Sequence, residues 1–143
     1  MSELNDHHLR TAGPADTAAL LDFWKSAAEG TSISDDPEGV DRLIARDAES
    51  VIIAERDGRI VGTVIAGWDG WRCHLYRLAV APDARRQGIG GALLAAAERR
   101  FTALGGRRGD AMVLDHNELG RHTWRAAGYA PEPQWSRWTK PLG

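Results

Sequence analysis

Residues 85–94 read RRQGIGGALL, a basic glycine-rich stretch that bears on both the fold and the function. It follows an apolar run typical of a strand (residues 75–80, LYRLAV) and a short turn, and it leads into a helical pattern at residues 92–104. The N–H groups and the dipole at a helix start favour an anion, and glycine lets backbone approach a phosphate closely. The sequence therefore predicts an anion-binding loop, to which Arg85 and Arg86 add positive charge.

Three kinds of phosphate-binding glycine loop can be compared with this one. A Walker-type loop ends in Gly-Lys-Ser/Thr, which the chain lacks. A dinucleotide fingerprint needs a third small residue where the chain has Leu93, and it follows the first strand rather than mid-chain. The remaining pattern, Arg/Gln-x-x-Gly-x-Gly/Ala, matches Arg85, Gly88 and Gly90 and resembles the acyl-CoA pyrophosphate loop of the GNAT acetyltransferase superfamily. The alternative is a basic turn that caps a surface helix.

Composition narrows the class of protein. The chain has 143 residues, enough for one domain with a core, and we expect a single domain over residues 1–143. A net charge of −2 gives no overall attraction to nucleic acid or to an anionic membrane. Cys73 is the only cysteine, no His/Cys/Asp set has metal-ligand spacing, and no apolar run approaches the length of a membrane span. We therefore expect a cytoplasmic protein that binds no metal, nucleic acid or membrane.

Turn residues and hydrophobic spacing give the order of the elements. The expected strands lie at residues 9–12, 51–56, 60–66, 71–80 and 110–115, with one or two closing strands between residues 129 and 140. The expected helices begin at Pro14, Pro37, Ala92 and Glu118. Asp-Gly turns at 57–58 and 69–70 make the three central strands antiparallel. The order β-α-α-β-β-β-α-β-α-β predicts a single mixed α/β sheet, in which the strand after the long helix runs parallel to its neighbour.

This order is that of the GNAT fold, so the chain resembles the superfamily over nearly its whole length. Residues 53–91 are similar to the YpeA-type branch, with AE-x-x-G-x-x-VGTV at 54–64 and G-x-DG at 67–70. The resemblance implies an acetyl-CoA-dependent N-acetyltransferase, which transfers the acetyl group by direct attack of a primary amine. The acceptor would be a small molecule or a protein, and fold alone does not choose between them. A homodimer through the closing strands is left open.

The resemblance also implies where acetyl-CoA binds. Its pyrophosphate would lie on the amides of residues 86–91, and its pantetheine arm beside residues 78–80, where two strands separate and expose backbone groups. Asn117 matches an asparagine near the cofactor arm, and it would serve equally well as a helix cap. The expected cofactor-binding residues are Leu78, Ala79, Val80, Arg85, Arg86, Gln87, Gly88, Ile89, Gly90, Gly91, Asn117 and Trp124.

Acyl transfer to an amine needs a base and a donor for the oxyanion. In the histone-acetylating branch a glutamate lies six residues before the strand valine that precedes the loop, and counting back from Val80 gives His74. We expect His74, or a water that it orders, to be the base, because histidine titrates near neutral pH; an ordinary strand histidine is the alternative. On a regular strand, residues 74, 76, 78 and 80 share one face, so Tyr76 would line the acceptor pocket. A strand amide at residues 78–80 would bind the oxyanion.

The position of the usual acid departs from the family. Many members have a tyrosine four residues before the glycine of Tyr-x-x-x-Gly-Phe, where this chain has Trp124, and Tyr129 stands at the Phe position. An indole N–H is not a useful acid at neutral pH. The thiolate therefore leaves unassisted, takes a proton from water, or catalysis is impaired. The last case supports an alternative function, a non-catalytic acyl-CoA-binding sensor module. A nucleotide-binding protein is a third reading, without nucleotide-specifying residues to support it.

Acceptor selectivity is expected in residues 29–37 and in the turn at residues 68–72. Asp35 and Asp36 would attract a cationic amine, and Trp71 would stack on it. The alternative for the two aspartates is a helix N-terminus, where acidic side chains complement the dipole.

Overall fold

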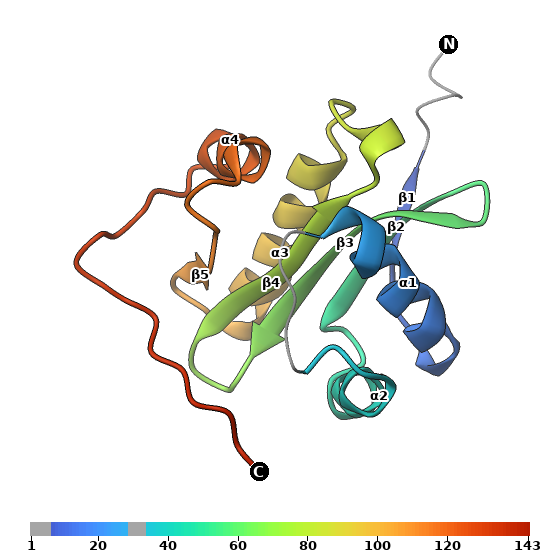
Figure 1. The fold of residues 1–143 in the computed structure, drawn as a ribbon, viewed down its shortest axis with the longest axis horizontal. Coiled ribbons are helices and arrows are strands. Elements are labelled where there is room, and N and C mark those ends of the chain that lie inside the picture. Colours follow the sequence, from blue (N-terminus) through green and yellow to red (C-terminus); the bar gives the residue numbers. More distant parts are fainter. Residues whose placement is uncertain (1–6, 29–33) are drawn as a thin grey trace.

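A five-stranded sheet in the order β1-β2-β3-β4-β5 organises the protein (Figure 1). The computed structural model describes residues 7–28 and 34–143. The strands within these two ranges are β1 (His8–Thr11), β2 (Val51–Arg56), β3 (Arg59–Trp68), β4 (Cys73–Val80) and β5 (Gly109–Ala111). The α-helices of the described ranges are α1 (Thr17–Ala27), α2 (Pro37–Arg46), α3 (Ile89–Leu104) and α4 (Glu118–Ala126). Strands β1 to β4 pair antiparallel and β5 pairs parallel to β4, which confirms the predicted mixed sheet.

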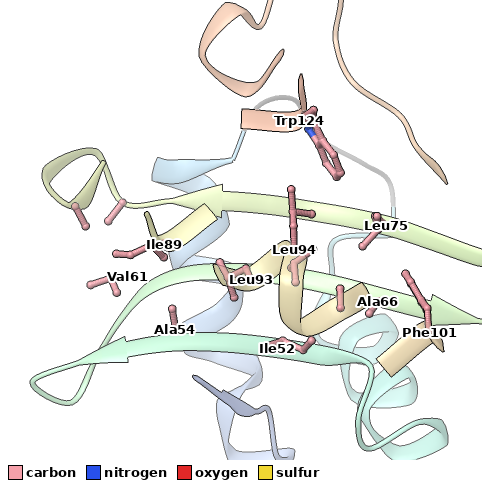
Figure 2. Packing of buried hydrophobic residues seen from close by; sticks show 14 of the residues in the cluster. Ile52, Ala54, Val61, Ala66, Leu75, Ile89, Leu93, Leu94, Phe101 and Trp124 are labelled. Carbon is pink, nitrogen blue, oxygen red and sulfur yellow. The ribbon is translucent and has the colours of Figure 1, made fainter. Parts of the chain in front are cut away.

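Helices cover both faces of the sheet (Figure 1). The long helix α3 packs on one face, where Leu93, Leu94 and Phe101 meet apolar side chains of β2, β3 and β4 (Figure 2). Helices α1 and α2 cover the other face, where Leu20 and Ile44 belong to a second core. The central strands β2 and β3 therefore alternate side chains between two apolar layers and are buried on both faces, as an α/β sheet requires.

Several predicted boundaries are confirmed by the local chemistry of the chain. Asp57 and Gly58 have φ of 55° and 73°, the conformation of a tight turn that joins antiparallel strands. Helix α2 begins at Pro37, whose ring suits the first helical position. Helix α3 begins at Ile89, earlier than the expected Ala92. Gly88, in a left-handed conformation, is its N-cap, so the helix starts immediately after this glycine.

The expected closing strands are wrong. Residues 127–143 form neither helix nor strand, and the Trp135 and Trp138 side chains are 73% and 92% exposed. Pro131 and Pro133 have no N–H group to donate to a sheet, and β5 is only three residues long, so it offers little edge for pairing. The strand expected at 110–115 is likewise shorter and lies at Gly109–Ala111.

Strand β4 is interrupted by a bulge. The register between β3 and β4 shifts between Thr63 and Ile65, so that Arg77 and Leu78 lie together opposite Val64. Arg77 has a φ of 51°, a left-handed conformation that is uncommon for a residue with a side chain. The extra residue bends the strand and re-aims the side chains that follow it.

The bulge overturns the expectation that residues 74, 76, 78 and 80 share one face. Before it, Leu75 lies in the core beneath α3; after it, Ala79 lies in the core beneath α1 and α2. Leu78 and Val80 pack against the α3 core instead. His74 and Tyr76 therefore lie on the α1/α2 side of the sheet, and Leu78 and Val80 on the other.

No helix in the part of the chain that the structure describes combines the length and the apolar content needed to cross a bilayer.

An ion pair ties α3 to the segment before β2. Nη2 of Arg100 donates to both carboxylate oxygens of Asp47, at 2.7 and 2.6 Å, and its Nη1 donates to the carbonyl oxygen of Ala66. The two charged side chains are only 13% and 25% exposed. Removing one partner leaves a poorly solvated charge, which is strongly destabilising.

We expect Arg100→Met to lower the free energy of unfolding by about 2–3 kcal/mol, because Asp47 would lose its partner while partly buried. Arg59→Met is the matched control. Arg59 also pairs with an aspartate, Asp83, but both side chains are more than half exposed, and such pairs contribute little. Urea denaturation of the two variants measures the difference; equal stabilities would contradict a structural role for the Arg100 pair.

A second ion-pair network anchors β1 and makes stability depend on pH. Arg10 donates to Asp16 at 2.8 and 2.9 Å. This bond, together with the Gly13 N–H, lowers the pKa of Asp16 from 3.8 to about 2. Because the folded pKa is depressed, the contribution is complete above pH 4 and is lost as pH falls towards 2.

Asp16→Asn should therefore be less stable than the wild type at pH 6 and should show a shallower fall in Tm between pH 4 and pH 2. Thermal unfolding across that range measures both effects. Parallel curves for the two proteins would mean that Asp16 does not gain its stability from the Arg10 pair.

Candidate functional site

A cleft of about 1180 Å³ lies between the end of β4, the loop before α3 and the side of α4. Ala27, the last residue of α1, reaches the same cleft. Ten of the expected cofactor-binding residues line it: Leu78, Ala79, Val80, Arg85, Arg86, Gly88, Ile89, Gly90, Gly91 and Asn117. Residues far apart in the chain are thus brought to one wall, and only Gln87 and Trp124 of the expected set lie elsewhere.

The loop before α3 has the geometry of an anion site. Arg86 and Gly88 are both left-handed, with φ of 64° and 79°, and Gly88 has no side chain with which to cap the helix. The first turn of α3 lines the cleft, so its N–H groups, which have no partner within a helix, lie at the wall. Arg85 and Arg86 line the same wall and add positive charge. This arrangement suits a phosphate group.

Glycine stands at positions 88, 90 and 91 for a different structural reason in each case. Gly88 adopts a positive φ that a side chain would strain. Gly90 lies where α3 meets α4, because a Cβ there would approach Cγ2 of Thr123 to 2.9 Å. Gly91 has ordinary helical conformation, and a Cβ would meet nothing within 4 Å. Gly91 therefore leaves open space at the mouth of the helix, as a bound group would need.

The side chain of Gln87 faces away from the cleft. Its Oε1 accepts a hydrogen bond from Nη1 of Arg56 on β2, at 2.7 Å. Close by, Arg59 of β3 pairs with Asp83, at 3.2 Å. The β2–β3 hairpin thus holds the loop from outside, and any contact of Gln87 with a ligand falls to its backbone.

Comparison with known proteins assigns the chain to a family. The sequence model described as the Acetyltransferase (GNAT) family matches residues 18–129. The chain belongs to this family. The match begins in the first turn of α1, runs past the end of α4 and covers every residue that lines the cleft.

Relatives of this GNAT protein carry the same general name. Acetyltransferase ECA0875 of Pectobacterium atrosepticum is 32% identical over 103 residues, which are 72% of this chain and 73% of that protein. An acetyltransferase of Yersinia pestis (strain Pestoides F) is 38% identical over 84 residues, 58% of this chain; the match spans only 60% of the Yersinia protein. The YpeA-type branch stays a prediction.

Solved structures share the fold. PaiA N-acetyltransferase from Thermoplasma acidophilum, in complex with coenzyme A, superposes with a TM-score of 0.77 at 17% identity, over 89% of this chain and 91% of that one. AAC(6′)-Iy with a bisubstrate analogue gives a TM-score of 0.75 at 20% identity, over 96% and 99%. At these identities the likeness shows a common GNAT fold, and the predicted fold is confirmed.

Asn117 fulfils the capping role and also lines the cleft of this GNAT domain. Its Oδ1 accepts the Gly120 N–H at 2.9 Å, which caps α4. A Cβ on Gly120 would approach Nδ2 of Asn117 to 2.4 Å, so a side chain at position 120 would displace the capping amide. The two alternatives that the sequence left open are therefore compatible, because Asn117 caps the helix through its oxygen and also lines the cleft.

Trp124 lies in the protein core. Its side chain is 8% exposed and points from α4 towards the core that contains Leu75 and Leu94 (Figure 2). Tyr129 packs edge-on against the indole, with ring centroids 5.1 Å apart, and donates a hydrogen bond to Glu98 at 2.8 Å. Burial and this bond to Glu98 raise the pKa of Tyr129. Contact of Trp124 with a cofactor stays a prediction, and the observed packing favours a structural role.

His74 and Tyr76 lie outside the cleft, near the start of β4 on the α1/α2 side. Nδ1 of His74 lies 2.9 Å from Oδ1 of Asp110, and its Nε2 lies 3.6 Å from Oδ2 of Asp69. Tyr76 is half exposed, and its ring centroid is 6.3 Å from that of His74. Burial, and to a smaller degree Asp110, raises the pKa of Tyr76. The imidazole is thus held between two carboxylates.

The aspartates expected to attract a cationic amine have partners within the protein. Asp36 caps α2 and accepts the Gly39 N–H at 2.7 Å. Asp35 forms an ion pair with Arg77 of the β4 bulge. Residues 29–33 of the expected selectivity segment lie outside the described residues. Trp71 is 73% exposed and is stacked by Arg72, whose guanidinium carbon lies 4.2 Å from the ring centroid.

Sequence reasoning missed one wall of the cleft. Leu119, His122, Thr123 and Ala126 line it from α4. Their spacing of three and four residues is that of one helical face, and this periodicity was the available signal. Within the described ranges, no three His, Cys, Asp or Glu side chains gather in a group that could hold a metal ion.

Proposed function

We propose that the protein is an acetyl-CoA-dependent N-acetyltransferase, in which a primary amine of a small molecule or a protein attacks the acetyl thioester directly. The supporting observation is that one continuous cleft joins the N-terminus of α3 to the end of β4. One end of the cleft suits a phosphate and the other offers strand backbone, which matches a ligand with a charged pyrophosphate and a long amide-bearing arm.

The residues of the cleft fit acetyl-CoA in this orientation. The pyrophosphate would lie on the N–H groups of the first turn of α3, beside Arg85 and Arg86. The pantetheine arm would lie along residues 78–80. β5 pairs only with Cys73, His74 and Leu75 of β4, so the later backbone of β4 is not covered by β5 and can pair with amides of the arm.

The geometry of the bulge favours the Leu78 N–H as the oxyanion donor. The Arg77–Leu78 peptide is trans, and the Arg77 carbonyl accepts a hydrogen bond from Thr63. The N–H of a trans peptide points opposite to its carbonyl, so the Leu78 N–H points away from Thr63. When the amine nitrogen attacks the thioester carbon, the carbonyl oxygen would become negative and be stabilised by this N–H.

Proton transfers complete the reaction. As the tetrahedral intermediate collapses, the C–S bond breaks, coenzyme A leaves as a thiolate and the new amide bond remains. His74, or a water that it orders, would accept the proton of the amine. A thiol pKa of about 8.5 permits the thiolate to leave unassisted. Among the described residues that line the cleft, His122 carries an imidazole that could donate a proton to the thiolate.

The alternative function is a non-catalytic acyl-CoA-binding sensor. The buried Trp124, at the position where many family members have a tyrosine, is the observation that favours it. Both functions need the cleft, so ligand binding alone does not separate them; turnover does. The acceptor, a homodimer and the cellular location stay predictions from the sequence.

Release of free coenzyme A from acetyl-CoA, measured across a panel of amines and peptides with a no-acceptor control, tests the proposal. Release that depends on one class of acceptor is the expected result. Silence across the panel, with coenzyme A still protecting the protein against thermal unfolding, would favour the sensor. If no acceptor causes release and coenzyme A does not protect the protein against thermal unfolding, the assignment of acetyl-CoA as cofactor is wrong.

Gly91→Ala should weaken coenzyme A binding by about tenfold while stability is unchanged or higher. The added methyl enters open space at the helix start, where the pyrophosphate is proposed to lie, and alanine favours a helix by up to about 1 kcal/mol. Gly13→Ala, whose methyl also meets no close contact and lies away from the cleft, is the control. Calorimetric titration gives both dissociation constants; an unaltered Kd for Gly91→Ala would contradict the pyrophosphate placement.

His74→Ala should flatten the acidic limb of the pH profile of kcat/KM, because the group that must be unprotonated would be gone. Steady-state rates between pH 5.5 and 8.5 measure it, with His8→Ala, a mostly exposed histidine of β1, as control. If the acidic limb of the pH profile is unchanged in His74→Ala, His74 is not the base and is an ordinary histidine of the strand surface.

A further inference from the structure

A buried hydrogen-bonded chain links α1 to the bulge of β4. The indole N–H of Trp24 donates to the hydroxyl oxygen of Thr63 at 3.0 Å, and the Thr63 hydroxyl donates to the carbonyl oxygen of Arg77 at 2.8 Å. An indole N–H only donates and a carbonyl oxygen only accepts, so the direction of both bonds is fixed. Trp24 and Thr63 are 5% and 0% exposed, which leaves the chain shielded from water.

The hydroxyl of Thr63 is unusual in its surroundings. Thr63 pairs with Ile53 across the sheet and follows the same face as Ile65, and both isoleucines belong to the apolar core beneath α1 and α2. A valine has almost the shape of threonine and would fill the same space, although it would remove the acceptor of the Trp24 indole N–H. The hydroxyl is therefore not needed for packing, and its two bonds are its evident contribution.

The chain acts on a peptide whose conformation needs support. Arg77 is left-handed, with a φ of 51°, and such residues persist only where their surroundings hold them. Thr63 holds the carbonyl of this residue, while Asp35 pairs with its guanidinium, which lies 5.8 Å from the Trp24 ring centroid. Both the backbone and the side chain of Arg77 are thus fixed from the α1/α2 side.

We propose that Thr63, oriented by Trp24, is a positioning residue for acyl transfer. By fixing the direction of the Arg77 carbonyl, it fixes the opposite direction of the Leu78 N–H, the donor proposed for the oxyanion. This inference rests on the proposed function, and it adds two buried residues that touch neither substrate. It predicts that the hydroxyl matters for the rate of transfer and not for binding of coenzyme A.

Two substitutions at one position separate the hydroxyl from the packing. Thr63→Val keeps the shape and removes both hydrogen bonds, and we expect kcat to fall by about tenfold to a hundredfold, since a misdirected oxyanion donor loses much of its effect. Thr63→Ser keeps the hydroxyl and should recover most of that rate. The Kd for coenzyme A should stay within about twofold in both variants, because the phosphate end of the cleft is unchanged.

Thr17→Val is the matched control. Thr17 is also buried on the α1/α2 side, and its hydroxyl donates to Asp41, far from β4 in the chain. Its loss should lower stability and leave kcat unchanged. A kcat for Thr63→Val equal to that of the wild type, or an equal loss in the Val and Ser variants, would overturn the inference.

A spectroscopic readout distinguishes failure of this inference from failure of the proposed function. In ¹H–¹⁵N spectra, acetyl-CoA should shift the Leu78 amide further than coenzyme A does, and Thr63→Val should abolish that difference while Thr63→Ser retains it. If the wild type shows the difference but no amine is acetylated, catalysis fails and the positioning stands. If amines are acetylated but the Leu78 amide shift is the same in the wild type and in Thr63→Val, the positioning role of Thr63 is wrong and the proposed function stands.

If Thr63→Val does not fold, Trp24→Phe is a second variant that tests the same proposal. The ring still packs in the core, but Thr63 loses the donor that orients it, so a kcat between those of the wild type and Thr63→Val is expected. An unchanged kcat and an unchanged Leu78 amide shift in a folded Trp24→Phe would remove Trp24 from the proposal.

Discussion

The parallel pairing of β4 with β5 stops at Leu75, and the rest of the site depends on where it stops. Beyond that residue β4 bulges at Arg77 and keeps only its antiparallel partner, β3. A strand that loses one neighbour exposes backbone donors and acceptors, which a bound peptide-like chain can satisfy. The same interruption reverses the alternation of side chains, so that Leu78 and Val80 join the side of the sheet covered by α3.

The loop after β4 supplies the complementary end of the cleft. β4 runs directly through a short turn into α3, so the strand edge and the helix N-terminus lie at one site. Under the proposed function, backbone groups would provide most of the recognition of the ligand, and the glycines would keep side chains away from these groups. The β2–β3 hairpin reinforces the loop from outside through Arg56 and Gln87. The cleft is thus supported by elements that do not line it.

The turns and the starts of several helices could be predicted from the sequence, because they depend on the local chemistry of the chain. Asp57-Gly58 predicted a hairpin, and Pro37 predicted the start of a helix. The glycine pattern before residue 92 predicted the N-terminus of another helix. The closing strands were predicted wrongly because aromatic residues at 129–138 suggest a strand, whereas Pro131 and Pro133 remove the donors that pairing needs. The α4 wall of the cleft was missed although its side chains recur at helical spacing.

The sequence by itself determined the order of the elements from β1 to α4, the glycine-rich loop at the start of α3 and membership of the GNAT family, since each follows from residues adjacent in the chain. Only the tertiary structure decided which side chains meet. It showed that the bulge separates Tyr76 from Leu78 across the sheet, that Gln87 faces Arg56, and that Trp124 enters the core. It also joined Trp24 to Thr63, 39 positions away, and Thr63 to Arg77, 14 positions away. Such contacts depend on strand register and helix packing, which no local pattern encodes.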